Sequence, residues 1–135
     1  MTRREAREAL FALLYEMTYN SPDELEATLS VARENRDLDD EYILTSVRGV
    51  YANLSEIDSK IEANAKGWKI SRLARTTLSI LRLSIYEMLY GEIPYTISIN
   101  EAVELAKKYD DDQAPVFING ILNTVAQKAG LKDKQ

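Results

Sequence analysis

The stretch from residue 43 to residue 61, ILTSVRGVYANLSEIDSKI, decides the fold class. Its large apolar residues recur at alternating spacings of four and three, the pattern of a helix that packs along other helices. Asp39 or Asp40 can cap its start, and Gly67 stands where a left-handed terminating residue belongs. A helix is therefore predicted from about residue 40 to 65, with a kink at 53–55 as the open alternative. The stripe consists of Ile43, Val47, Val50, Leu54, Ile57 and Ile61.

The same helical periodicity continues on both sides of this stretch, and no segment alternates in the manner of a half-buried strand. Ser21 with Glu24 and Ser98 with Glu101 have the spacing of capping boxes, and Ser71 can cap a further helix. The last helix is predicted from Pro115 to just before Gly130. The pattern predicts an all-α protein of about six to seven helices. Its first helix has the apolar stripe Ala6, Leu10, Leu13, Leu14 and Met17.

Composition excludes most catalytic chemistry. The 135 residues fit one domain, 1–135, and they include neither cysteine nor histidine. A thiolate nucleophile, a zinc–thiolate site and an imidazole base are therefore excluded. The only dense carboxylate cluster, 110–112, lacks the spaced ligands and glycine turn of a calcium loop, so it is interpreted as a solvated connection. We predict no metal, no cofactor and no enzymatic activity.

The N-terminal sequence MTRREAREALFALLYE lacks the uncharged apolar core of a signal peptide. No stretch approaches the length of a membrane span. A soluble, cytoplasmic protein with no membrane partner is expected.

Charge is distributed very unevenly along the chain. Eight acidic residues lie between positions 23 and 41, and the net charge is −5. No acid occurs between Glu62 and Glu87, a window that contains five basic residues. These basic residues either form salt bridges with the acidic segment or bind phosphate. Eight tyrosines provide candidate surfaces for stacking on unpaired RNA bases. The basic residues of the window are Lys66, Lys69, Arg72, Arg75 and Arg82.

Two glycines, Gly49 and Gly120, fall inside predicted helices, where glycine costs up to roughly 1 kcal/mol relative to alanine. The favoured interpretation is the close approach of two helix backbones. Contact between a ligand and the backbone is the alternative.

Three motifs together resemble the NusB family of transcription antitermination factors. They are RREAREALFALLYE at 3–16, LRLSIYEMLYGEIPYTISINEAVELAKKY at 81–109 and PVFINGILN at 115–123. The motifs follow one another in the order of that family and span nearly the whole chain. The resemblance implies a compact all-α bundle of two packed helical subdomains.

The resemblance also implies a function without catalysis. Members of the family pair with NusE, a small-subunit ribosomal protein, and the pair binds boxA-type single-stranded RNA in nascent ribosomal transcripts. The complex joins RNA polymerase and supports processive transcription. Some members form a homodimer, and a purely structural dimer is one rival interpretation. The other rival is an RNA-targeting module of a methyltransferase, for which this chain has no cofactor-binding unit.

The motifs also carry expected site residues. On the RNA side the resemblance implies arginines of the first motif, with asparagines and one aromatic residue of the third. On the partner side it implies Tyr15, at the end of the first motif, and Glu87, in the second. The arginines taken by themselves could equally be solubilising charge. The RNA-side residues are Arg3, Arg4, Arg7, Phe117, Asn119 and Asn123.

Overall fold

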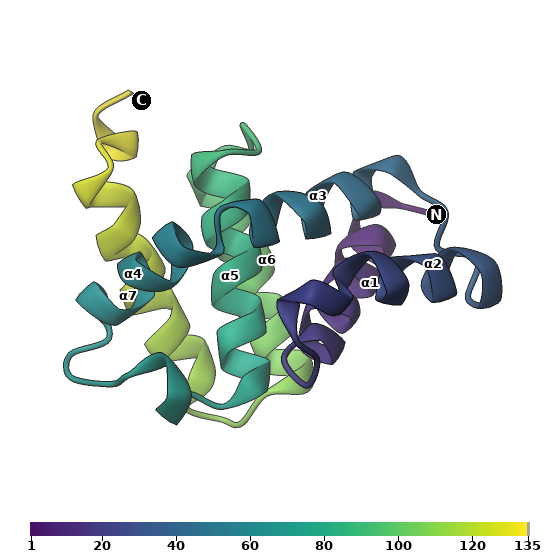
Figure 1. Ribbon diagram of the computed structural model, residues 1–135. Coiled ribbons are helices and arrows are strands. Elements are labelled where there is room, and N and C mark those ends of the chain that lie inside the picture. The colour runs from purple at the N-terminus through teal and green to yellow at the C-terminus, as the bar shows by residue number, and fades with distance from the viewer. Residues whose placement is uncertain (135) are drawn as a thin grey trace.

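The protein folds into seven α-helices and three short 3-10 helices, with no strand, within residues 1–134, which the computed structural model describes (Figure 1). None of these helices is long and apolar enough to cross a membrane. The α-helices are α1 (Arg3–Met17), α2 (Leu25–Asn35), α3 (Glu41–Ala52), α4 (Leu54–Asn64), α5 (Arg75–Leu89), α6 (Tyr95–Tyr109) and α7 (Ala114–Lys128). The 3-10 helices are η1 (Pro22–Glu24), η2 (Ile70–Arg72) and η3 (Leu131–Lys134).

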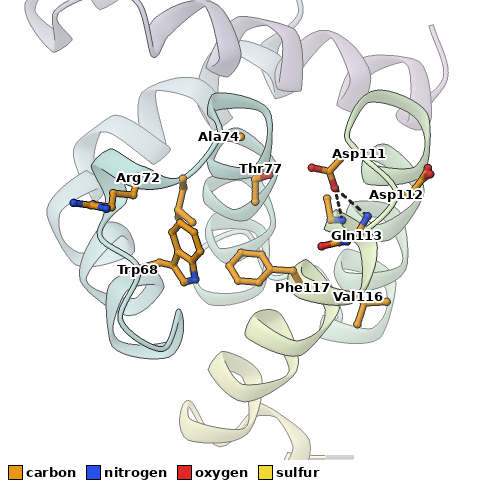
Figure 2. Close-up of a pocket in the computed structure, with 11 residues that line it drawn as sticks. Trp68, Arg72, Ala74, Thr77, Asp111, Asp112, Gln113, Val116 and Phe117 are labelled. Atoms are coloured by element: carbon orange, nitrogen blue, oxygen red, sulfur yellow. Dashed lines mark hydrogen bonds between the residues drawn. The ribbon is translucent and has the colours of Figure 1, made fainter.

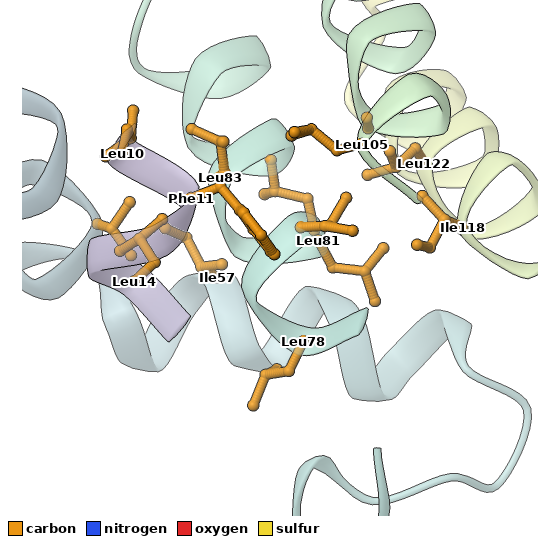
Figure 3. Packing of buried hydrophobic residues seen from close by; sticks show 14 of the residues in the cluster. Leu10, Phe11, Leu14, Ile57, Leu78, Leu81, Leu83, Leu105, Ile118 and Leu122 are labelled. Atoms are coloured by element: carbon orange, nitrogen blue, oxygen red, sulfur yellow. The ribbon is translucent and has the colours of Figure 1, made fainter. Parts of the chain in front are cut away.

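Helix α5 is the centre of the bundle. It contacts α1 and α3 on one side and α4, α6 and α7 on the other, so two helical groups share it. Figure 3 shows leucines of α1 and of α6 and α7 converging on α5 from opposite sides. The predicted all-α class and its arrangement as two packed groups are confirmed.

The stretch at 43–61 forms two helices that meet at Asn53. This residue has φ −118° and ψ 20°, and its side-chain amide donates to the Gly49 carbonyl at 2.8 Å, a bond that favours the end of a helix. The break divides one apolar stripe between two helices that pack on different neighbours. Helix α3 packs on α1 and α5, and α4 packs on α5 and α7.

The predicted helix starts are confirmed in part. Ser21 and Glu24 form their capping box, and the Asp40 carboxylate accepts from the Ile43 amide at 3.0 Å. The prediction for Ser71 is wrong, because this residue lies within η2 and α5 begins only at Arg75.

The capping box at Ser98 is also wrong. Helix α6 begins at Tyr95, directly after Pro94, whose φ of −52° already suits a helix entry. Ser98 therefore lies inside the first turn, where it is fully buried and its hydroxyl bonds to Ser84. Glu101 has another partner, Arg4 of α1.

A tight turn after α4 sets the direction of Trp68. The Trp68 amide donates to the Ala65 carbonyl at 3.2 Å, and both central residues have positive φ, +48° at Lys66 and +90° at Gly67. Glycine adopts this conformation without a steric penalty, whereas residues with a Cβ do not. The predicted left-handed role of Gly67 is confirmed.

Replacing Gly67 tests this turn. We expect Gly67→Ala to lower the free energy of unfolding by about 1–2 kcal/mol, because alanine is strained at this φ although an added Cβ would meet no neighbouring atom. Gly67→Asn is the matched control and should cost less, since asparagine tolerates the left-handed region. Urea denaturation measures both. Equal stability of Gly67→Ala and the parent would contradict the turn.

Candidate functional site

A groove lies between the turn at Trp68 and the first turn of α7, with a volume of about 690 Å³. Figure 2 shows the rings of Trp68 and Phe117 side by side in it, below Ala74, which precedes α5, and Thr77, in its first turn. The Trp68 residue is 50% exposed and Val116 is 78% exposed, although both are large and apolar. We call this the Trp68–Phe117 groove. Its walls offer flat apolar surfaces to a ligand.

The connection from α6 to α7 fixes the far wall of the groove. The Asp111 carboxylate accepts from the backbone amides of Gln113 (3.0 Å) and Ala114 (2.9 Å), which caps the start of α7. The Asp110 carboxylate accepts from the Thr77 hydroxyl at 2.6 Å and ties the connection to α5. The acidic cluster thus has structural partners, and the described residues contain no cluster of His, Cys, Asp or Glu that could hold a metal ion.

Arg72 lines the groove, and Lys66 and Lys69 lie close to Trp68 in the sequence. Lys66, Lys69 and Arg72 are exposed, and no salt bridge within residues 1–134 involves any of them. Asp112 and Asp111 lie on the opposite wall, but the Asp111 carboxylate is engaged by the α7 amides. The groove thus has one lining cation, Arg72, and two further cations lie next to Trp68 along the chain.

The other two basic residues of the acid-free window between Glu62 and Glu87 make contacts inside the protein. Arg82 forms two hydrogen bonds to the Asp58 carboxylate of α4, at 2.9 and 2.8 Å. Arg75 donates to the Thr18 carbonyl at the end of α1, and its guanidinium lies 4.1 Å from the Tyr19 ring centre. The acidic segment at residues 23–41 forms a salt bridge with none of the five basic residues of the window.

The N-terminal arginines divide into two exposed residues and one buried residue. The Arg3 guanidinium lies 3.8 Å from the Tyr42 ring centre, and Arg4 pairs with Glu101 at 2.9 Å. Arg7 is only 4% exposed and donates to the Glu87 carboxylate at 2.9 Å. Arg7 therefore lies inside the protein, because it shares the inward face of α1 with the apolar stripe.

Glu87 is likewise buried, at 2% exposure. Its carboxylate accepts from Arg7, from the Tyr42 hydroxyl at 3.0 Å and from the Ser98 hydroxyl at 3.0 Å. Burial, reinforced by the Glu87 charge, raises the pKa of the Tyr42 hydroxyl to about 12, so Tyr42 remains a donor at neutral pH. The expected partner residue Glu87 thus holds α1, α3, α5 and α6 together, and surrounding side chains cover it.

Tyr15 belongs to an aromatic cluster formed by α1, by Tyr19 just beyond its end and by Tyr109 at the end of α6. Its hydroxyl lies 3.1 Å from the Tyr19 hydroxyl, and the Phe11 ring stacks on Tyr109 with centres 5.2 Å apart. The hydrogen bond to Tyr19 is the main reason that the pKa of Tyr15 is raised. Tyr19 is 62% exposed and Tyr109 is 45% exposed. We call Phe11, Tyr15, Tyr19 and Tyr109 the tyrosine cluster.

The asparagines of the third motif lie together on α7. Asn119 is exposed and Asn123 half-buried, one turn apart, and the Asn123 side-chain amide donates to both the backbone and side-chain oxygens of Asn119, at 2.9 and 3.1 Å. Phe117 precedes them on the same helix and is half-buried in the groove.

The expected RNA-side residues therefore occupy three places. Phe117 and the asparagines lie on α7, Arg3 and Arg4 lie at the start of α1, and Arg7 lies in the interior. Sequence reasoning missed Trp68 as a site residue, although a lone tryptophan between Lys66 and Lys69 was the available signal.

The fold and the groove define a class of small all-helical protein with an aromatic, cation-flanked surface. The family model for the NusB family matches residues 4–127. The transcription antitermination protein NusB of Acetivibrio thermocellus is 47% identical over 131 residues, which cover 94% of this chain and 90% of that protein. The chain belongs to the NusB family.

Solved structures agree with this assignment. The structure of T. maritima NusB superposes with a TM-score of 0.85 at 32% identity, covering 95% of this chain and 92% of that one. A crystal structure of the antitermination factors NusB and NusE in complex with dsRNA matches with a TM-score of 0.79 at 27% identity. That match covers 93% of this chain and 96% of the other.

The buried ion pair gives a stability prediction. We expect Arg7→Leu to lower the free energy of unfolding by about 3–5 kcal/mol, because it leaves the Glu87 charge buried without a counter-ion. The double variant Arg7→Leu/Glu87→Leu should be more stable than this single variant, since it removes both charges. Urea denaturation with tryptophan fluorescence measures both.

Arg4→Leu is the matched control for this prediction. Its side chain is 70% exposed, so loss of the pair with Glu101 should cost less than about 1 kcal/mol. If Arg7→Leu were no more damaging than Arg4→Leu, the pair with Glu87 would not be a structural element.

Proposed function

We propose that this chain is an RNA-binding transcription antitermination factor that pairs with NusE and binds boxA-type sequences of nascent ribosomal RNA. In this role it supports processive transcription by RNA polymerase and catalyses no reaction. The observation that carries the proposal is the Trp68–Phe117 groove, which Arg72 lines and in which Trp68 has Lys66 and Lys69 close to it in the sequence. The NusB relative that was crystallised with NusE and RNA supports it.

The groove fits unpaired bases. Aromatic side chains bind single-stranded RNA by stacking on base faces, and neighbouring cations bind its phosphates. Trp68 and Phe117 supply two rings, and Arg72 supplies a cation of the lining. Lys66 and Lys69 lie close to Trp68 in the sequence and add positive charge. Bases in a duplex already stack on one another, so the ligand proposed here is single-stranded, in contrast to the dsRNA of the crystallised relative.

The N-terminal arginines extend the proposed contact. Arg3 and Arg4 stand at the start of α1, and Arg75 links the far end of this helix to the start of α5 beside the groove. Helix α1 has 15 residues, so its two ends are about 22 Å apart. A strand of several nucleotides bridges that distance, with Arg3 and Arg4 on its phosphates. Arg7 acts indirectly, because its pair with Glu87 fixes the position of α1.

The tyrosine cluster is the proposed surface for NusE. Exposed tyrosines are enriched in protein interfaces because they offer a large apolar area and a polar tip. Tyr15 and Tyr19 lie beside Arg75, next to the start of α5, so NusE would be bound between the groove and the arginines. The chain has a net charge of −5, so we expect weak RNA binding alone and tighter binding with NusE.

Replacing Trp68 tests the groove. We expect Trp68→Ala to weaken binding of a labelled boxA-type RNA about 5- to 150-fold, the range for loss of one base–aromatic stack. Fluorescence anisotropy with NusE present measures the affinity. Val31→Ala, an exposed apolar residue on α2, is the matched control and should bind as the parent does.

Three outcomes would contradict the proposal or a part of it. Parent protein that binds no boxA-type RNA with or without NusE would reject the function. Equal affinity of Trp68→Ala and parent would leave RNA binding intact but move it away from the groove. A duplex probe that binds as tightly as the single strand would reject the stacking mechanism.

Replacing Tyr15 tests the partner surface. We expect Tyr15→Ala to weaken the affinity for NusE roughly tenfold, as for a buried tyrosine of an interface, and to weaken RNA binding by the protein alone much less. Isothermal titration calorimetry measures the affinity for NusE, and fluorescence anisotropy measures the affinity of the protein alone for RNA. Thermal unfolding checks that the variant stays folded. Unchanged NusE affinity in a folded variant would place the partner elsewhere.

A further inference from the structure

A second cleft lies between the first turns of α1 and the outer face of α6, with a volume of about 350 Å³. Its lining contains four cations, and each of them forms a salt bridge with a carboxylate of the protein. The charge of the cleft is therefore neutralised from within, unlike that of the basic residues near Trp68. The four pairs are Arg4–Glu101, Arg7–Glu87, Lys107–Glu104 and Lys108–Glu8.

The pair between Arg4 and Glu101 rests on a single hydrogen bond. Arg4 Nη2 donates to Glu101 Oε1 at 2.9 Å, and no other side-chain hydrogen bond within residues 1–134 involves either residue. The Arg4 side chain is 70% exposed, whereas that of Glu101 is 18% exposed. A pair with so exposed a member adds little to stability. Most N–H donors of the Arg4 guanidinium therefore face solvent without a protein partner.

A phosphate group would compete with the Glu101 carboxylate for this guanidinium. Arginine binds phosphate and carboxylate in the same way, with charge-assisted hydrogen bonds from the same N–H groups. A phosphate that binds Arg4 must therefore displace the carboxylate or lie close to it, and like charges at such a distance repel one another. Glu101 thus opposes the contact that Arg4 offers.

We propose that Glu101 lowers the RNA affinity of the free protein by competing with RNA phosphate for Arg4. RNA binding exchanges the Arg4–Glu101 pair for a contact between Arg4 and phosphate, and it leaves the Glu101 carboxylate to water in the open cleft. This inference rests on the proposed function and adds an internal competitor to it. The weak binding expected of the protein alone then has a local cause in addition to the net charge.

Removing the charge of Glu101 tests the competition. We expect Glu101→Gln to bind boxA-type RNA roughly two- to fivefold more tightly than the parent, the range for release of an exposed ion pair. Fluorescence anisotropy without NusE measures the affinity. Glutamine keeps the length of the side chain and an acceptor oxygen, so the variant should stay folded, which thermal unfolding checks.

Glu104→Gln is the matched control. It removes the same charge from the same cleft, one turn further along α6, but the partner of Glu104 is Lys107. We expect it to raise the RNA affinity less than Glu101→Gln does, because it does not release Arg4.

The same substitutions in an Arg4→Leu background isolate the pairing. Arg4→Leu alone should weaken RNA binding and make the slope of log affinity against log salt shallower by about 0.7, the value for one phosphate of a single strand. Once Arg4 is absent, Glu101→Gln should improve binding no more than Glu104→Gln does, since only the loss of a nearby negative charge remains.

The readouts separate this inference from the proposed function. Equal gains from Glu101→Gln and Glu104→Gln in the protein that retains Arg4 would overturn the competition, since a general effect of charge would explain both. Parent-like affinity and salt slope of Arg4→Leu would overturn it too, and so would loss of the folded state in Glu101→Gln. Each of these results leaves the effect of Trp68→Ala in place. Parent protein that binds no RNA would overturn both proposals.

Discussion

Burial of α5 on almost all sides constrains the rest of the molecule. Eleven of its fifteen residues are buried, including the charged residues Arg82 and Glu87. A buried charge is costly unless it is paired and hydrogen-bonded, so each of these residues needs a partner from another helix. Arg82 obtains Asp58 from α4, and Glu87 obtains Arg7 from α1. The two pairs fix the helices on opposite sides of α5 relative to one another.

This arrangement determines where functional surface is available. Arg7 is used in the interior, which leaves Arg3 and Arg4 as the exposed arginines of the first motif. The groove forms where α5 begins, because the turn through Gly67 brings Trp68 opposite Phe117 and Asp111 fixes the start of α7. The proposed RNA site thus depends on the same helix that organises the core.

Several features of the fold were predictable because they depend on local spacing. The stripe from Ile43 to Ile61 predicted a packed helix, and the kink left open near Asn53 is where α3 and α4 separate. The cap predicted at Ser71 was wrong because the chain forms η2 there before α5 begins, and the cap at Ser98 was wrong for a different physical reason. A serine hydroxyl suits both a helix start and a buried hydrogen bond, and only the neighbours of Ser98, namely Ser84 and Glu87, decide between them.

The sequence by itself determined the helical class, the capping at Ser21, the left-handed turn at Gly67 and, through three motifs, the family. It left Asp39 and Asp40 as alternative caps of the next helix, and the structure selects Asp40. These properties follow from short-range periodicity, backbone sterics and motif order. Only the tertiary structure decided which charges are surface and which are core. Helical spacing gave Arg3 and Arg7 a common face, but it contains no information about the distant carboxylate of Glu87. Close backbones were predicted at the two glycines inside helices, but the Tyr86 ring fills the space that a Cβ would need at Gly49, and no other helix reaches that space at Gly120. These surroundings, like the pairing of Trp68 with Phe117, depend on how helices far apart in the chain pack together.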